Sequence, residues 1–287
     1  MNYMTEKQAK KAIIDIGQRM YVRNFVAAND GNISIKTGDN EVWATPTGVS
    51  KGYMKKKMLV KVDLDGNVLE GSYKPSSELK MHLRAYRENS DIRSVCHAHP
   101  PICTCFAIAG IPLDAPVLAE AIITLGDVPI APYAELGSKE VPEVIAPYCH
   151  THNGILLANH GAVTWAEDAY SAYYRLESME YYANILLITD KILGKQNLLS
   201  EEQINALLAM RDKFGVKMGG VPKEEKTNQE VRKDEGVWIP TERRSRGEKR
   251  WKRLKTKNQQ KQCFQKICLL STQNISRDVV TDVRLMK

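Results

Sequence analysis

Two histidines, His97 and His99, lie two positions apart at the end of the segment Ser94-Val95-Cys96-His97-Ala98-His99-Pro100. Residues two apart on an extended strand point to the same face of it. Both imidazoles are therefore directed to one side of any sheet that this segment joins. Such a pair indicates either half of a metal site or two histidines that form hydrogen bonds within a core.

A metal ion at this pair would need further ligands from elsewhere in the chain. His160, in Asn159-His160-Gly161, follows the apolar run 155–158 and is the obvious third imidazole. Glu78, in Pro75-Ser76-Ser77-Glu78, is a candidate for the fourth ligand. Three histidines with one carboxylate or one open position are typical of a catalytic zinc site, whereas thiolates dominate structural sites. These residues predict one Zn²⁺ per chain.

The six cysteines are weaker candidates for ligands. They contain no Cys-x-x-Cys pair, and Cys96 faces opposite to His97 on a strand. Burial as small apolar side chains is therefore preferred for Cys96, Cys103 and Cys105. Since there is also no cleavable apolar leader, we expect a reducing, cytoplasmic location. Apolar runs such as 185–188 are far shorter than the roughly 20 residues needed to cross a bilayer, so no membrane association is expected.

Three other histidines need a separate interpretation. His150 and His152 form a second His-x-His pair, but they lie between a predicted helix and a predicted strand without a carboxylate motif nearby. We interpret them as part of a solvated turn. His82 lies one helical turn after Glu78, where packing or support of a ligand is preferred over metal binding.

Hydrophobic periodicity predicts a mixed chain of helices and strands. The first helix opens with the capping-box pattern Thr5-Glu6-Lys7-Gln8. The predicted helices cover about 5–22, 79–88, 103–109, 141–148, 166–193 and 201–214. The predicted strands are a hairpin over 33–44, a second strand and turn over 58–66, a strand over 92–99, strands near Val117 and Ile130, and a buried strand over 154–158.

Three short loops have the chemistry of an anion site. The turn at Gly31-Asn32 lets backbone amides approach a ligand closely and adds an amide donor. Thr45-Pro46-Thr47-Gly48 is a second loop of small residues that can converge on the same ligand. Ser76-Ser77 is predicted at the N-cap of the next helix, where free amides and the helix dipole suit a phosphate. Plain turns and plain helix capping are the alternatives.

Six motifs, in this order and spacing, resemble the class II aldolase and adducin superfamily, and within it the zinc aldolases that act on L-fuculose 1-phosphate. The resemblance covers about residues 5–219. It implies an α/β fold with a central, mostly antiparallel sheet flanked by helices. The motifs are Gly31-Asn32-Ile33-Ser34, Thr45-Pro46-Thr47-Gly48, Pro75-Ser76-Ser77-Glu78, His97-Ala98-His99, Ala131-Pro132-Tyr133 and Asn159-His160-Gly161.

The resemblance also implies roles for individual residues. The reaction would be the reversible cleavage of a phosphorylated deoxyketose to dihydroxyacetone phosphate and an aldehyde such as L-lactaldehyde, in a homotetramer. Glu78 would transfer the proton on the three-carbon fragment and serve as a possible fourth metal ligand. The substrate phosphate would be held by Gly31, Asn32, Thr47, Gly48, Ser76 and Ser77, and Zn²⁺ by His97, His99, His160 and Glu78.

One departure from the family leaves the reaction open. In the fuculose enzymes a Tyr about twenty residues after the histidine pair is thought to protonate the aldehyde oxygen, but here residues 116–120 contain no Tyr. Glu120 is a candidate for a related role. The alternatives are a methylthioribulose-1-phosphate dehydratase, an L-ribulose-5-phosphate 4-epimerase, and a non-catalytic adducin-like interaction domain. The last is disfavoured because such domains lack these histidines.

Charge divides the chain in two. The formal net charge is +7, but residues 221–287 hold 18 Lys and Arg and 9 Asp and Glu, which leaves 23 basic and 25 acidic residues in 1–220. We therefore expect a catalytic domain over 1–220 without a nucleic-acid partner, followed by a basic tail with a flexible linker over 223–262. Ser276 could cap a short amphipathic helix over 275–286, which resembles the peptides that dock enzymes inside bacterial microcompartments; an unstructured tail is the alternative.

Overall fold

Eight strands form one sheet in the order β4-β3-β2-β1-β5-β8-β7-β6 in the computed structural model, which describes residues 3–222, 237–240 and 251–254. Every neighbouring pair is antiparallel except β6 and β7, so the expected mostly antiparallel sheet is confirmed. The strands are β1 Asn32–Gly38, β2 Glu41–Ala44, β3 Val60–Val62, β4 Val68–Glu70, β5 Ser94–Ala98, β6 Ile130–Ala131, β7 Gly154–Leu157 and β8 Gly161–Ala166.

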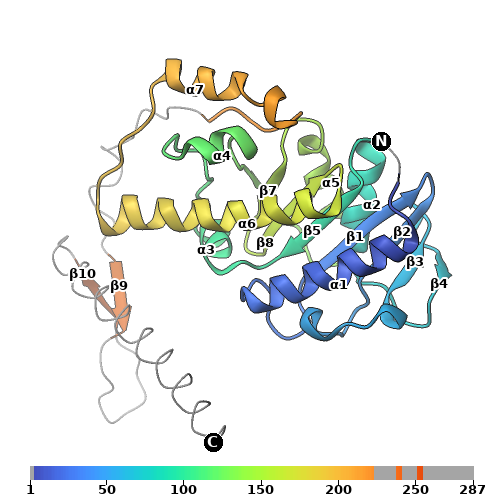
Figure 1. Cartoon of the computed structure of the whole chain (residues 1–287). Helices are drawn as coiled ribbons and strands as arrows, with labels where there is room; N and C mark the ends of the chain where they lie inside the picture. Colours follow the sequence, from blue (N-terminus) through green and yellow to red (C-terminus); the bar gives the residue numbers. More distant parts are fainter. Residues whose placement is uncertain (1–2, 223–236, 241–250, 255–287) are drawn as a thin grey trace, which may run out of the picture. The chain divides into compact units, whose positions relative to one another are not determined.

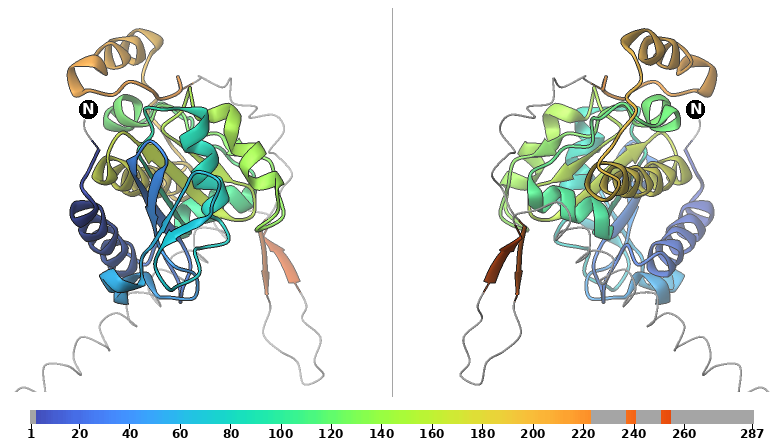
Figure 2. Two further views of the ribbon diagram at one scale, coloured as in Figure 1. Left: turned by 90° about the vertical axis from the view of Figure 1, so that its right-hand side faces the viewer. Right: turned by 90° about the vertical axis from the view of Figure 1, so that its left-hand side faces the viewer.

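Helices cover both faces of the sheet, as Figures 1 and 2 show. One hydrophobic cluster joins α1, α3 and α6 to the sheet, and a second joins α2 and α5 to its other face. The helices are α1 Glu6–Val22, α2 Leu79–Glu88, α3 Pro101–Ala109, α4 Ala119–Thr124, α5 Glu140–Ile145, α6 Ala169–Leu186 and α7 Glu201–Ala209, with short 3₁₀ turns at Lys51–Tyr53, Lys56–Met58, Ala146–Tyr148 and Asp212–Phe214 and a π-helical turn at Leu187–Ile192.

Strand β5 lies in the middle of the sheet, between β1 and β8. Its side chains alternate between the two hydrophobic clusters: Cys96 and Ala98 pack with α1 and α6, whereas Val95 packs on the α2 side. His97 is on the α2 side, since its Nε2 lies 3.6 Å from the carboxylate of Glu78 at the N-cap of α2. The sequence-based prediction that Cys96 and His97 face opposite ways is confirmed.

Two element predictions were wrong. Residues 161–166 form β8, so α6 begins at Ala169 rather than at 166; Asp168 caps it by accepting hydrogen bonds from the backbone of Tyr170 and Ser171. Val117 lies in an irregular segment before α4 rather than in a strand. In both cases apolar residues alone did not distinguish strand from helix or loop.

The chain divides into a larger unit, Met1–Lys191 with Lys195–Glu224, and a smaller unit, Ile192–Gly194 with Glu225–Lys287. Within the expected linker 223–262 the structure describes two strands, β9 Val237–Pro240 and β10 Trp251–Leu254, which pair antiparallel. The rest of that linker and the expected terminal helix 275–286 lie outside the described residues. In the described part of the chain, no helix has the length and apolar character that crossing a membrane requires.

Candidate active site

His97 and His99 are held by the central strand and the turn that follows it. His97 is fully buried and pairs across the sheet with Asn32 on β1 and Val163 on β8. The backbone N–H of His99 donates to the carbonyl of Phe25 at 2.9 Å. The two ring centroids are 5.1 Å apart. The structure therefore brings both imidazoles together, as the two-residue period of the strand predicted.

His160 comes from the tight turn between β7 and β8. Asn159 takes the left-handed conformation in this turn, with φ of 56°, which asparagine tolerates better than most residues. Gly161 follows, and a Cβ there would lie 2.5 Å from the Ala98 carbonyl oxygen and 2.6 Å from the His99 ring. Because glycine permits this close approach, the His160 ring centroid lies 4.7 Å from that of His97 and 4.9 Å from that of His99.

The free nitrogens of these rings fit a metal ion. His97 Nδ1 lies 2.9 Å from the Ala162 carbonyl oxygen, which can only accept, so Nδ1 carries the proton and Nε2 presents a lone pair. His99 Nδ1 faces the Asp30 carboxylate at 3.5 Å. The Nε2 atoms of His97 and His99 are buried and have no hydrogen-bond partner among the described residues. One nitrogen from each of the three rings lies within 4.8 Å of the others, an arrangement suited to a transition metal.

His97 and His99 are held in the neutral form that binds metals. Burial lowers the pKa of His97 to about 3. Burial, and then the neighbouring His160, also lowers the pKa of His99. Neutral imidazoles at neutral pH keep their lone pairs for coordination. The geometry of the cluster and the neutral state of His97 and His99 therefore both favour metal binding.

Glu78 completes the cluster. Its Oε1 lies 3.1 Å from His160 Nε2 and 3.6 Å from His97 Nε2, and its Oε2 accepts a hydrogen bond from Asn32 Nδ2 at 2.7 Å. Burial raises the pKa of the carboxyl group, but His97, His160 and the Asn32 amide outweigh it, so the pKa lies below its ordinary value. Glu78 lies at the N-cap of α2, because the helix begins at Leu79.

A cavity of about 200 Å³ opens beside the histidines and Glu78. Of the six residues predicted to hold phosphate, Gly31, Thr47, Ser76 and Ser77 line it. The loops at Gly31 and at 45–48, which were expected to converge, both line the cavity. The loop at Pro46 is also joined to Pro75 by a backbone bridge. Gly48 and Asn32 are not among the lining residues; the buried Asn32 amide bonds to Glu78 and to Ser76 Oγ instead.

The serines do not cap α2 in the predicted way. Because Glu78 holds the N-cap position, Ser76 lies two residues before it, and Ser76 Oγ accepts a hydrogen bond from the Glu78 backbone N–H at 3.3 Å. This local turn still directs the Ser76-Ser77 segment to the cavity. Asp30 and Lys51 also line the cavity, and sequence reasoning missed both. In the sequence, the only indication of a role for these two residues was that Asp30 precedes the motif at Gly31 and that Lys51 closely follows the motif at 45–48.

His82 lies in the core between α2 and β1. It is fully buried, its Nδ1 lies 2.8 Å from Ser34 Oγ, and burial lowers its pKa to about 3. Ser34 Oγ also lies 2.7 Å from the Tyr86 hydroxyl. The predicted packing or supporting role of His82 agrees with this geometry.

The remaining candidates lie away from the cavity. Glu120, in the first turn of α4, is exposed and does not line it, and the Tyr133 side chain is 66 % exposed. His150 is exposed in a turn as predicted. His152 is less exposed than the prediction of a solvated turn implies: its side chain is 17 % exposed, and its Nε2 lies 3.5 Å from the Asp127 carboxylate. The sequence did not show this contact because Asp127 is on a separate loop.

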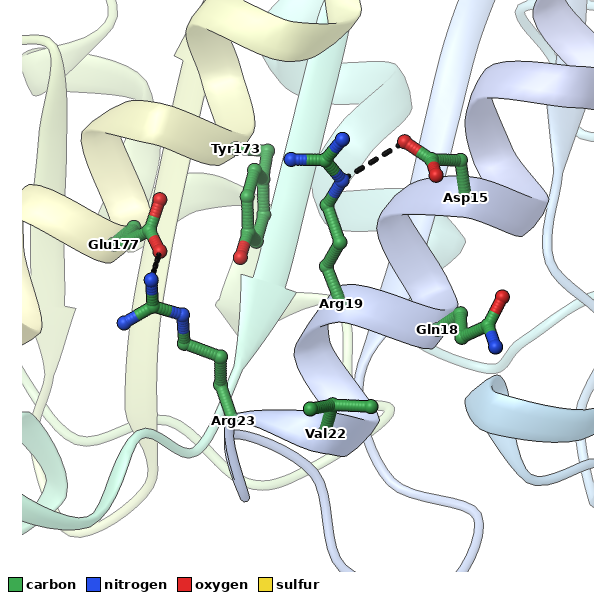
Figure 3. A pocket seen from close by; sticks show the side chains of 7 residues that line it. All are labelled: Asp15, Gln18, Arg19, Val22, Arg23, Tyr173 and Glu177. Carbon is green, nitrogen blue, oxygen red and sulfur yellow. Dashed lines mark hydrogen bonds and ion pairs between the residues drawn. The ribbon is translucent and has the colours of Figure 1, made fainter.

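A second hollow, of about 320 Å³, lies between α1 and α6 (Figure 3). Its charges pair with one another: Arg19 with Asp15, and Arg23 with Glu177. No histidine lines it. Paired surface charges of this kind indicate a solvated face, so the candidate active site is the cavity beside the histidines.

Fold and site together define the class of protein: an α/β domain with three converging imidazoles and a polar cavity beside a mostly antiparallel sheet. Residues 11–187 match the family described as "Class II Aldolase and Adducin N-terminal domain". The match spans more than half of the chain, so the chain belongs to the class II aldolase and adducin family.

The chain is similar to relatives that are named for more than one reaction. The chain is 35% identical over 179 residues to an L-fuculose phosphate aldolase of Methanocaldococcus jannaschii, covering 62% of this chain and 96% of the relative. It is 31% identical over 214 residues to a 5-deoxy-D-ribulose 1-phosphate aldolase of Bacillus thuringiensis serovar kurstaki, covering 74% and 99%. It is also 31% identical over 186 residues to a 3-oxo-tetronate 4-phosphate decarboxylase of Haemophilus influenzae, covering 63% and 88%.

Among solved structures, the fold is similar to an L-fuculose 1-phosphate aldolase, with a TM-score of 0.67 and 30% identity over 74% of this chain and 98% of that chain. The α/β class II aldolase fold expected from the motifs is thus confirmed. Family and relatives together support an enzyme of the aldolase type, a lyase.

Proposed function

We propose that this protein is a zinc-dependent aldolase that reversibly cleaves a phosphorylated deoxyketose, such as L-fuculose 1-phosphate, to dihydroxyacetone phosphate and an aldehyde such as L-lactaldehyde. The observation that carries the proposal is the convergence of three imidazole nitrogens within 4.8 Å, next to Glu78 and a polar cavity. An adducin-like interaction domain would not need three converging imidazoles, two of which, His97 and His99, have buried Nε2 atoms without a hydrogen-bond partner among the described residues.

The metal would be held by His97, His99 and His160, with Glu78 as the candidate fourth ligand. When bound, Zn²⁺ supplies a Lewis acid for the negative charge that carbon–carbon cleavage leaves on the ketose fragment. Asp30 orients the His99 ring, and the Ala162 carbonyl orients that of His97. Such contacts to the second ring nitrogen fix the tautomer and the direction of the free one.

The protein residues bind the phosphate and move one proton. Ser76, Ser77, Thr47 and the backbone at Gly31 offer hydroxyl and N–H donors to a phosphate in the cavity. In the condensation direction the Glu78 carboxylate removes a proton from C3 of the three-carbon fragment. In the cleavage direction the C4 hydroxyl of the ketose releases one proton as the C3–C4 bond breaks, and Glu78 returns one proton to C3. Asn32 holds the carboxylate in place through its 2.7 Å hydrogen bond.

A second candidate is decarboxylation of a 3-oxo acid phosphate. The relative named for that reaction favours it, and so does the absence of a Tyr in residues 116–120. Decarboxylation leaves the same kind of negative charge on a phosphorylated fragment but needs no acid for an aldehyde oxygen. The dehydratase and the 4-epimerase are the other reactions that a test must distinguish.

The experiment is a substrate panel for the purified enzyme with zinc. The panel contains L-fuculose 1-phosphate, L-rhamnulose 1-phosphate, 5-deoxyribulose 1-phosphate, 3-oxo-tetronate 4-phosphate, methylthioribulose 1-phosphate and L-ribulose 5-phosphate. We expect dihydroxyacetone phosphate to form from a 1-phosphorylated deoxyketose. Release of CO₂ alone, or only dehydration or epimerisation, would show that the aldolase proposal is wrong.

Two finer proposals concern assembly and location in the cytoplasm. The family resemblance supports a homotetramer, for which light scattering should give the mass of four chains. The resemblance of residues 275–286 to encapsulation peptides supports docking inside a bacterial microcompartment. Co-purification with shell proteins tests this proposal, and a free chain in the cytosol would favour the unstructured tail.

A further inference from the structure

Lys51 is a buried lysine in the wall of the candidate active site. Its side chain lines the cavity, yet the residue is only 1 % exposed. Its Nζ donates to the carbonyl oxygens of Asn29 at 2.6 Å and Val49 at 2.8 Å. Asn29 precedes Asp30-Gly31, and Val49 follows Thr47-Gly48. One ammonium group therefore joins the two loops that flank the cavity.

Its charge has no partner within ion-pair distance among the residues that the structure describes. Lys61 makes a useful contrast, because its Nζ lies 2.8 Å from Glu6 and 2.9 Å from Glu41. Burial lowers the pKa of Lys51 to about 8, with Asp30 and Glu78 opposing this effect from a distance. A buried charge without a partner destabilises a fold unless something else compensates it.

The backbone of Lys51 is also tightly placed. Gly17 on α1 packs against it so closely that a Cβ there would lie 2.8 Å from the Lys51 carbonyl oxygen. At Gly52 a Cβ would lie 2.5 Å from the Tyr21 ring. Two glycines thus let the turn at Lys51–Tyr53 dock directly on α1, which fixes where the lysine side chain starts.

An ammonium group has three N–H donors. The two carbonyls use two of them, which leaves one donor and a positive charge beside the cavity. We propose that Lys51 is a substrate-positioning residue: it fixes both loops and supplies the positive charge that favours a dianionic phosphate ester. This inference rests on the proposed function, because the proposed substrate is a phosphate ester.

The test measures the Kd of inorganic phosphate for the zinc-loaded full chain by calorimetry, together with kcat and KM for the ketose phosphate. Lys51→Met removes the charge and the donors at similar length. We expect its Kd for phosphate and its KM to rise about tenfold or more, the usual change when a hydrogen bond to a charged group is lost. We expect zinc content to be unchanged and kcat to change much less. Lys51→Arg, which keeps the charge, should restore part of the affinity.

Lys61→Met is the matched control, because it removes an ion-paired lysine outside the cavity; phosphate affinity should stay as in the wild type. If Lys51→Met binds phosphate like the wild type while Ser76→Ala binds it more weakly, the role of Lys51 is wrong and the proposed function stands. If the wild type and Ser76→Ala bind phosphate equally, the proposed phosphate site itself fails. If Lys51→Met does not fold, Lys51→Gln replaces it. Loss of folding in both variants would make Lys51 purely structural and overturn the inference.

Discussion

At the scale of single residues, the His97 and His99 rings are oriented by the groups that their Nδ1 atoms face. The Ala162 carbonyl orients His97 and the Asp30 carboxylate faces His99. We expect about one Zn²⁺ per chain in protein purified without chelator. His97→Ala and His160→Ala should lose zinc and activity together, because each removes one of three nitrogen ligands.

Elemental analysis with activity assays on the same samples checks this prediction. His150→Ala is the matched control, since His150 is exposed in a turn and should leave both unchanged. A folded wild-type preparation without any metal would count against the zinc proposal and favour an adducin-like interaction domain.

Glu78 provides a second prediction at the residue scale. If it transfers the carbon-bound proton, Glu78→Gln should keep the fold and most of the zinc but lose roughly 10²–10⁴-fold in turnover. If it acts only as an acid at the start of α2, the change should cost about 0.3–1 kcal/mol of stability and leave turnover nearly intact. Turnover, zinc content and melting temperature on this one variant separate the two roles.

Single residues also show how far a sequence can predict a site. His97 and His99 could be paired because the two-residue period of a strand is a local rule. A role for Lys51 could not be assigned from the sequence, because that role depends on two backbone carbonyls that only the folded loops bring to its side chain. Asn32 was identified from the sequence as a site residue, but its amide holds Glu78 and does not line the cavity. This contact depends on the packing of β1 against the start of α2.

At the scale of elements, the close approach between β8 and the end of β5 is the feature with the clearest consequence. Gly161→Ala would place a Cβ against the Ala98 carbonyl and the His99 ring. We expect it to weaken zinc binding and to destabilise the fold by about 1–3 kcal/mol, the usual range for overpacking. Gly38→Ala is the control, because its Cβ would make only ordinary contacts with Glu41 at 3.5 Å. Equal behaviour of the two variants in zinc titrations and thermal melts would contradict this account.

Element boundaries were harder to predict than element types. The helix 5–22 and the hairpin 33–44 have strong local signals, namely a capping box and alternating apolar residues, and both are present. The strand β8 was missed because Ala162, Val163 and Ala166 suit either a buried strand or the start of the next helix. Its pairing with β5 and β7 decides between them, and those strands are distant in the sequence.

At the scale of the whole molecule, every described residue that forms the candidate site belongs to the larger unit. We expect a chain that ends at Pro222 to keep its fold, its zinc and its turnover, because none of the proposed site residues lies beyond it. Thermal melts, elemental analysis and kinetics on the shortened and full chains check this. Loss of turnover in a folded, zinc-loaded short chain would show that the tail contributes to the site.

The central position of β5 also determines when the site can form during folding. Ser94 on β5 bonds to Ser34, 60 residues earlier, and His97 contacts Ala162, 65 residues later. Pairings at such separations close slowly, since the entropy of long loops is lost before the contacts form. The newly made chain therefore has its ligands dispersed until the middle of the sheet is complete. We expect zinc capture, followed by stopped-flow fluorescence with a zinc dye, to coincide with the last phase of refolding, so that the nascent protein competes poorly for metal until it is native.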